Sequence, residues 1–358
     1  MKWNKYRVLL VLLIAITVWF TASKIKEASF IKNEYSTVSV RYGTGGVNEQ
    51  IISNALKNEK LQGNSDIPEV TAWFWIKEAE IKNRNFNRTQ KVSVVITSGN
   101  MALTTPMKLV RGNYVYRQDK VGCVIDTNTA YLLFGTEFAV GNTVTYDKKD
   151  YVIRGVVRAD YPVFLIQGSG DKMEYSNLEL GFMDKERGET LAEEFLLGNG
   201  PTGNYVIIDG YFYGRIIYSL ISLPVWLFFF FGGYEIFKIF YSYMNKQKPG
   251  HFILYSSILL LILAGYGFIL FRITGNPLYI PEKLIPTKWS DFDYWSKQYQ
   301  LIQNQILKIR YLTPNPKDVY LVDKISNLLL NTIVMFLLYM FIITDIHILR
   351  LKGKSKNN

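Results

Sequence analysis

The chain has 358 residues, of which 49% are hydrophobic and 15% aromatic, and its formal net charge is +11 at pH 7. This length suffices for one domain with its own core and for several membrane spans. The cations lie beside apolar runs, which favours a membrane protein over a nucleic-acid-binding protein. One cysteine and two histidines exclude an intrachain disulfide and argue against a Cys/His zinc site or a Cys–His nucleophile pair.

The first apolar run, residues 8–22, lies between two basic segments and predicts a transmembrane helix over residues 1–23. Flanking aromatic and lysine side chains extend the reach of this short run. The alternative is a cleaved secretory signal, because residues 21–23 supply the small side chains of a cleavage site. Trp19 and Phe20 so close to that site favour an uncleaved anchor.

Residues 24–213 are mixed in polarity and predict an α+β domain. A strand at 37–42 precedes the run Gly43-Thr44-Gly45-Gly46 and a helical pattern. Such a loop can hold phosphate, but it lacks the Walker lysine and the dinucleotide spacing, so we interpret it as a turn. The apolar pattern and the turn-forming residues between its runs predict the remaining elements. These are strands at 70–82, 91–97 and 205–208 and a helix at 187–197.

The most regular part of this domain is the stretch 109–158. Cys123–Ile125 is an apolar strand, and the cysteine is expected to be an inert core residue. A helix should begin at Asp126 or Thr127, which can cap it, and end at Gly135. Alternating residues over 144–157 then predict a hairpin with one buried face, with Gly141 and Gly155 where a side chain would crowd the backbone.

This stretch resembles the extracytoplasmic core domain of MacB/FtsX-like ABC transporter permeases. The resemblance lies in a strand, a short helix ending in Leu-Phe-Gly, a Val-Gly turn and a hairpin ending in Gly-Val. It is carried by Leu109, Arg111-Gly112, Asp119, Cys123-Val124-Ile125, Ala130, Leu133-Phe134-Gly135, Val140-Gly141, Val144 and Tyr151–Val157.

Three further apolar runs predict transmembrane helices at 214–240, 252–272 and 328–349, followed by a basic tail at 350–358. Cations beside the spans place both termini on the cytoplasmic side of a bacterial cell membrane. The expected fold class is therefore an α+β extracytoplasmic domain inserted between the first and second of four transmembrane α-helices.

The loop 273–327 also faces outward in this topology. Apolar residues spaced three and four apart, starting at Phe292 and Trp295, predict an amphipathic helix over 290–312, capped by Ser290 and Asp293. This helix could pack on the outer domain or lie on the outer leaflet of the membrane.

Ionisable residues in or near the spans are candidates for function. Glu235, Asp345 and His347 should lie near the cytoplasmic ends of their spans, where a structural anchor or ion pair is favoured over a proton path. Asn331 in the last span could bond across helices. No pair of residues can be assigned acid and base roles, so we expect neither catalysis nor a bound cofactor or metal.

The resemblance implies a permease subunit that exports or extracts a peptide, antibiotic or lipoprotein. ATP would be used by a separate cytoplasmic ABC ATPase, and the permease would form a homodimer or a heterodimer with another permease in the lipid bilayer. The segment that contacts the ATPase in this family corresponds here to Glu235, Lys238, Lys246 and Lys248.

Two departures from the family pattern support an alternative. The glycine of the family's Glu-Ile-Gly motif is missing after Glu235-Ile236, and the loop 273–327 is unusually long. The alternative is a non-transporting membrane protein whose outer domain binds a ligand or partner, as an accessory, immunity or sensing component.

Overall fold

The computed structural model divides the chain into two compact units. A membrane unit contains residues 1–32, 213–288 and 323–358, and a sheet unit contains residues 33–212 and 289–322. The structure describes residues 5–43, 45–104, 107–168, 170, 173–199, 204–244, 252–275, 279, 285–286, 288, 290, 292–311 and 315–355.

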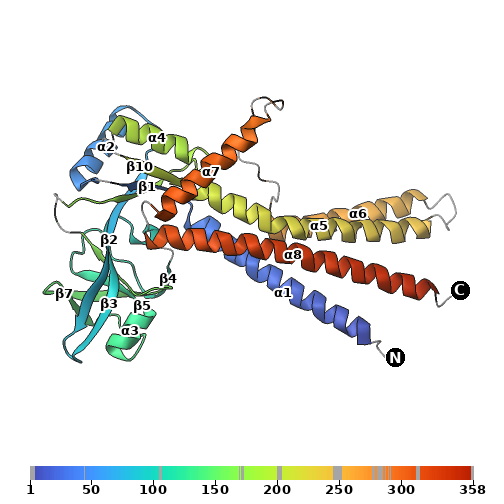
Figure 1. The fold of residues 1–358 in the computed structure, drawn as a ribbon, viewed down its shortest axis with the longest axis horizontal. Coiled ribbons are helices and arrows are strands. Elements are labelled where there is room, and N and C mark those ends of the chain that lie inside the picture. The colour runs from blue at the N-terminus through green and yellow to red at the C-terminus, as the bar shows by residue number, and fades with distance from the viewer. Residues whose placement is uncertain are drawn as a thin grey trace. The chain divides into compact units, whose positions relative to one another are not determined.

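The sheet unit is built on one ten-stranded sheet with the order β10-β1-β9-β2-β3-β8-β5-β7-β4, and β6 pairs with β2 and β7 (Figure 1). Its strands are β1 Val38–Tyr42, β2 Glu69–Asn83, β3 Arg88–Ser98, β4 Lys108–Gly112, β5 Gly122–Asp126, β6 Thr143–Tyr146, β7 Lys149–Arg158, β8 Val163–Gln167, β9 Asn177–Gly181 and β10 Tyr205–Asp209. Its helices are α2 Glu49–Leu61, α3 Thr127–Phe134, α4 Gly188–Asn199 and α7 Asp293–Tyr311, with a short 3-10 turn at Met101–Leu103.

The long hairpin of β2 and β3 divides the sheet into two parts, each with its own core. On one side, α2 and α4 pack together against β1, β9 and β10, and bury residues such as Val40, Leu178 and Phe195 (Figure 1). On the other side, α3 packs on β3, β5 and β7, and buries Ile125 and Leu133. Two parallel pairs, β3 with β8 and β5 with β7, interrupt an otherwise antiparallel sheet. The predicted mixed α/β domain is confirmed.

The stretch 109–158 folds as its sequence indicates. Asp126 caps α3 by accepting a hydrogen bond from Thr129 N at 2.9 Å, and Gly135 ends the helix with a left-handed φ of 76°. Gly141 also has a positive φ, of 90°, and a Cβ on Gly155 would lie 2.5 Å from the carbonyl oxygen of Asn113. The hairpin β6–β7 follows, and Cys123 is fully buried in β5.

Three strands of the sheet are not among the sequence expectations: β4, β8 and β9. The last two are five-residue strands that are buried on both faces, except for the half-buried Gly181, so β8 shows no alternation. Neighbours supplied by distant parts of the chain, rather than local patterning, define them.

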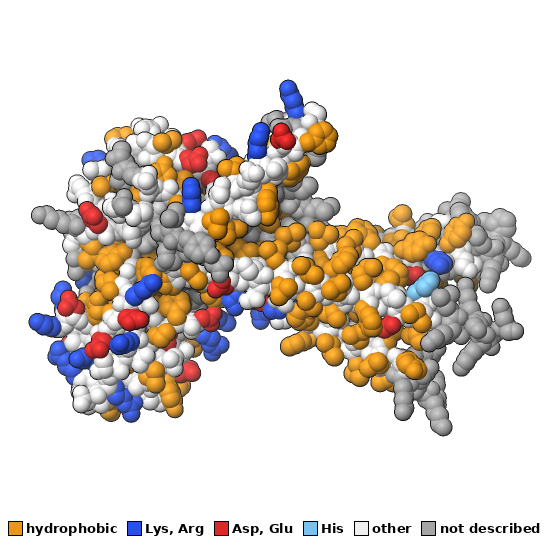
Figure 2. Space-filling view, viewed as in Figure 1, with side chains coloured by type: hydrophobic (Ala, Val, Ile, Leu, Met, Phe, Trp, Pro, Cys, Tyr) orange, Lys and Arg blue, Asp and Glu red, His pale blue; other side chains and the backbone are white. Residues whose placement is uncertain are grey.

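The membrane unit contains α6 Phe252–Thr274 and parts of α1 Lys5–Glu34, α5 Gly210–Met244 and α8 Pro316–Ser355. All four helices are long and apolar enough to cross a membrane. Hydrophobic side chains cover their surface (Figure 2). Helix α1 continues to Glu34, beyond the expected end of the first span at residue 23, and α8 begins twelve residues before the expected span 328–349.

Small and hydroxyl-bearing residues mark contacts between these helices. A Cβ on Gly214 of α5 would lie 2.8 Å from the Cα of Lys32 in α1, so the two backbones approach closely there. Thr21 of α1 shares a buried 2.8 Å hydrogen bond with the hydroxyl of Tyr339 in α8. Trp226 of α5 donates to Thr274 of α6 at 2.9 Å.

Candidate functional site: a buried charge cluster

The face of the sheet opposite α2 and α4 carries polar side chains in adjacent strands. Side chains alternate along a strand, so Val38 and Val40 of β1 enter the α2/α4 core while Ser39 and Arg41 point to the other face. The same alternation places Glu179 of β9 on that other face. All three polar residues are buried.

Arg41 is the centre of this polar face. Its guanidinium binds the Asp318 carboxylate through two contacts, Nε to Oδ2 at 2.7 Å and Nη2 to Oδ1 at 2.9 Å. Nη2 also lies 2.9 Å from Oε1 of Glu179. Nη1 donates to the carbonyl oxygens of Val40 and Leu178, at 3.2 and 3.3 Å. All three guanidinium nitrogens therefore have partners inside the protein.

Glu179 accepts contacts from five side chains. Oε2 lies 2.7 Å from Nζ of Lys317 and accepts from the hydroxyls of Ser39 at 2.5 Å and Thr37 at 3.2 Å. Oε1 accepts from the indole nitrogen of Trp73 at 3.1 Å and also contacts Arg41. A carboxylate that is 0% exposed is thereby fully satisfied.

The partners Lys317 and Asp318 come from the first turn of α8. Asn315 caps this helix, because its Oδ1 accepts from Asp318 N at 2.9 Å, and Pro316 occupies the first helical position. Lys317 also donates to the carbonyl oxygen of Leu103 at 2.6 Å, and its own carbonyl accepts from the hydroxyl of Tyr35 at 3.3 Å. The start of α8 is thus held on the sheet by side chains and backbone together.

Burial and pairing act on the pKa values in opposite directions. Burial favours the neutral form of Glu179, but the charges of Lys317 and Arg41 outweigh it and hold the pKa of this carboxyl below its ordinary value. Burial and the nearby Arg41 lower the pKa of the Lys317 ammonium, although Glu179 opposes them. The pKa of Arg41 is raised by Asp318 and Glu179 against the effect of burial.

We call Arg41, Glu179, Lys317 and Asp318 the charge cluster. It contains two cations and two carboxylates, so it is neutral as a whole. Buried ion pairs of this kind add little net stability compared with apolar residues, but loss of one partner leaves an uncompensated charge and costs several kcal/mol. The cluster is therefore suited to fixing one arrangement of α8 on the sheet.

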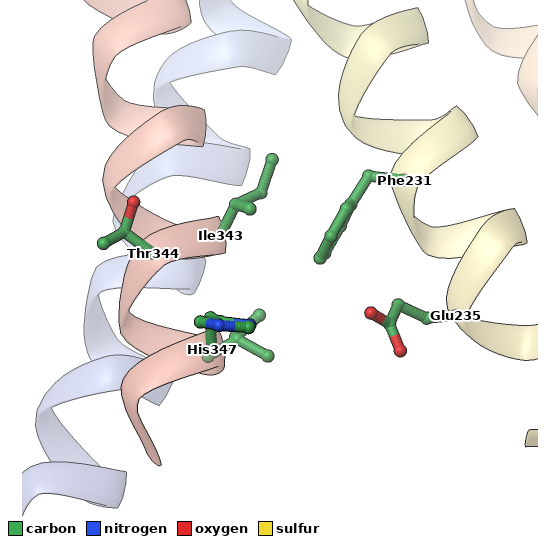
Figure 3. Close-up of a pocket in the computed structure, with 6 residues that line it drawn as sticks. Phe231, Glu235, Ile343, Thr344 and His347 are labelled. Carbon is green, nitrogen blue, oxygen red and sulfur yellow. The ribbon is translucent and has the colours of Figure 1, made fainter. Parts of the chain in front are cut away.

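The structure brings two of the predicted site residues together in the membrane unit. Glu235 of α5 and His347 of α8 line a cavity of about 310 Å³, together with Phe231, Ile343, Thr344 and Ile346. Figure 3 shows the Glu235 carboxylate and the His347 ring entering this cavity from the two helices. The cavity is a second candidate site.

The other predicted site residues lie elsewhere. Asn331 is half-buried on α8, sixteen residues and about 24 Å along the helix from His347. Asp345 is half-buried on α8 but does not line the cavity, and Lys238 is exposed on α5. Lys246 and Lys248 lie outside the described residues.

Within the described part of the chain, no group of three or more His, Cys, Asp or Glu side chains could hold a metal ion. Burial raises the pKa of the Cys123 thiol, which makes this residue a poor nucleophile.

Residues 8–178 match the family model described as MacB-like periplasmic core domain. The chain therefore carries a MacB-like domain, and the resemblance seen in the sequence is confirmed. The chain thus combines this domain with four helices that are long and apolar enough to cross a membrane.

Two solved structures are similar to parts of the chain. The periplasmic region of MacB from Actinobacillus actinomycetemcomitans has 16% identity and a TM-score of 0.40, over 51% of this chain and 92% of that one. The extracellular domain of the noncanonic ABC-type transporter YknZ from Gram-positive bacteria has 14% identity and a TM-score of 0.37, over 48% of this chain and 99% of that one. No curated protein matches the chain significantly in sequence.

The charge cluster is not among the sequence expectations. Arg41 stands in a predicted strand, and its position between Val40 and Tyr42 was a usable signal, because a cation on a fully buried strand needs a partner. Glu179 lies in β9, a strand that is not among the sequence expectations. Lys317 and Asp318 begin a helix whose apolar part starts only later.

Proposed function

We propose that this protein is the permease subunit of an ABC-type transporter that exports or extracts a peptide, antibiotic or lipoprotein with a separate cytoplasmic ATPase. The MacB-like match over residues 8–178 carries this proposal. The four apolar helices supply the membrane part that a permease needs.

The proposed topology places the sheet domain outside the cell, between the first and second of four spans in the bacterial cytoplasmic membrane. Both termini would be cytoplasmic, since basic residues flank those ends of the spans. In this arrangement the loop 273–327 and the first turn of α8 belong to the outer side.

In the proposed permease, the charge cluster would couple the apolar part of α8 to the outer domain. The apolar run of α8 follows in the same helix as Lys317 and Asp318, which bind Arg41 and Glu179 of the sheet. A shift of α8 would therefore act on β1 and β9 without an intervening loop. In the same way, a shift of β1 and β9 would act on α8.

In the proposed complex, ATP is bound by the partner and not by this chain. The segment with Glu235, Lys238, Lys246 and Lys248 would contact the ATPase, and a second permease copy or a related permease would complete a dimer. The exposed position of Lys238 is compatible with such a contact.

One observation favours the alternative, a membrane protein that binds a ligand or partner without transport. Helix α5 continues without a break to Met244, and Glu235 faces the cavity shared with His347. A carboxylate in that position is directed at α8 rather than at a cytoplasmic partner.

The test is affinity purification of the tagged full-length protein in mild detergent after cross-linking in cells, followed by mass spectrometry and an ATPase assay. The permease proposal expects a stoichiometric ABC ATPase, which is lost when residues 235–248 are replaced by a neutral linker. Replacement of the exposed outer residues Lys148 and Lys149 by Gln is the matched control and should leave recovery unchanged. Recovery of the protein without an ATPase would overturn the proposal and support the binding protein.

A further inference from the structure

Helix α7 has an apolar side that the function proposed above does not use. At 100° per residue, Trp295, Tyr299 and Ile306 fall within one narrow sector of the helix, and Phe292, one residue before the helix, extends the same line. We call these four residues the apolar stripe. Their exposed fractions are 87, 47, 62 and 37%.

The side of α7 that is less exposed is a different one. Tyr294, Gln298, Ile302 and Gln305 are half-buried, and the centre of their sector lies about a quarter turn from the centre of the apolar stripe. Helix α7 packs beside β10 in the sheet unit and extends away from the sheet (Figure 1). Packing on the sheet unit therefore leaves the apolar stripe open.

We infer that the apolar stripe of α7 binds the surface of the lipid bilayer. The stripe combines Trp, Tyr and Phe with an aliphatic residue, a composition found where an apolar body meets a polar headgroup layer. The sequence left this possibility open beside packing on the outer domain. The structure packs α7 beside β10, and the apolar stripe stays exposed in that position.

The connections of α7 allow this position. Residues 312–315 join it to α8, so the ends of the two helices can be at most about 18 Å apart. The first nine residues of α8 hold four charged side chains and span about 14 Å before the helix becomes apolar. The chain therefore limits the distance from the end of α7 to the apolar part of α8 to about 32 Å.

The neighbouring strand and the charge of α7 point to the same partner. Strand β10 ends at Asp209 and continues directly into α5, an apolar helix, so α7 is held beside a strand that leads into a span. Helix α7 contains three cations, Lys297, Lys308 and Arg310, and one carboxylate, Asp293. Its positive charge complements anionic phospholipid headgroups.

The test is spin labelling of the full-length protein in vesicles of phosphatidylcholine and phosphatidylglycerol at 3:1. Single cysteines replace Tyr299 or Ile306 in the apolar stripe, and Gln300 or Asn304, which are exposed and lie outside the stripe, serve as matched controls. Native Cys123 stays, because it is fully buried, and the parent protein should take up no label.

Collision rates with oxygen, which enters lipid, and with a nickel chelate, which stays in water, measure the depth of each label. We expect a higher oxygen-to-nickel ratio at Y299C and I306C than at Q300C and N304C, and a smaller difference in pure phosphatidylcholine. Equal access of the nickel chelate to all four labels would overturn the inference. Low access of both reagents at the stripe would also overturn it, since the stripe would then lie against protein. Dilution with unlabelled protein would show whether that protein is a second copy.

Discussion

The charge cluster and the Glu235/His347 cavity both bring ionisable side chains together, but they differ in burial and in pairing. In the cluster, each charged side chain is at most 3% exposed and directly paired, and the total charge is zero. In the cavity, Glu235 is half-buried and His347 exposed, and the space between them measures about 310 Å³. The first arrangement fixes a geometry, whereas the second leaves room for change.

Removing one charge from the cluster should lower the stability of the protein more than any change in the cavity. Glu179→Gln keeps the volume but leaves Arg41 and Lys317 buried with only one carboxylate. We expect the free energy of unfolding to fall by about 3–5 kcal/mol. Thermal unfolding in detergent measures the effect, and Glu193→Gln, on the exposed side of α4, is the control that should change little.

Removing a complete pair should be milder than removing half of it. Arg41→Met and Asp318→Leu should each be strongly destabilising, because each leaves a buried charge without its partner. The double variant retains the neutral Glu179–Lys317 pair, so we expect it to be more stable than the sum of the single losses by about 1–3 kcal/mol. Additive losses in this double-mutant cycle would refute the direct coupling of Arg41 and Asp318.

Acid should weaken the cluster in a defined direction. The folded-state pKa of Glu179 is below its ordinary value of 4.5, so its carboxylate contributes stability that is fully present above pH 4.5. This contribution is lost as the pH falls through the lowered pKa. Wild type should therefore lose more stability than Glu179→Gln between pH 5 and pH 3, and parallel pH profiles would contradict the assignment.

The cavity should respond weakly to the same kind of change. Glu235→Gln and His347→Gln are expected to shift the free energy of unfolding by less than about 1 kcal/mol, since neither side chain is fully buried. Thermal unfolding at pH 7 provides the measurement. A loss as large as that of Glu179→Gln would show that the two sites do not differ in kind.

The sequence predicted those parts of the fold whose signals are local. Helix α3 is fixed by the cap at Asp126 and the stop at Gly135, and the apolar helices are fixed by hydropathy over a whole span. Strands β8 and β9 were missed because both of their faces are buried by residues distant in sequence. Elements were predicted where the residues that determine them are close in sequence, and were missed where those residues are distant in sequence.

The candidate sites follow the same rule. Glu235 and His347 were predicted because ionisable residues stand out within apolar runs, and the structure brings them to one cavity. Asn331 and Asp345 gave the same signal but do not line it. The charge cluster joins residues 41, 179 and 317–318 across three distant segments, and no local pattern connects them.

The central claim is that the charge cluster anchors the start of α8 to the sheet. Hydrogen–deuterium exchange of the full-length protein, wild type against Glu179→Gln, tests it most directly. We predict slow exchange for the amides of residues 319–326 in the wild type, marked acceleration there in the variant, and no change within α6. Unchanged exchange over 319–326 in a variant that has lost stability would contradict the claim, because the cluster would then stabilise the sheet without holding α8.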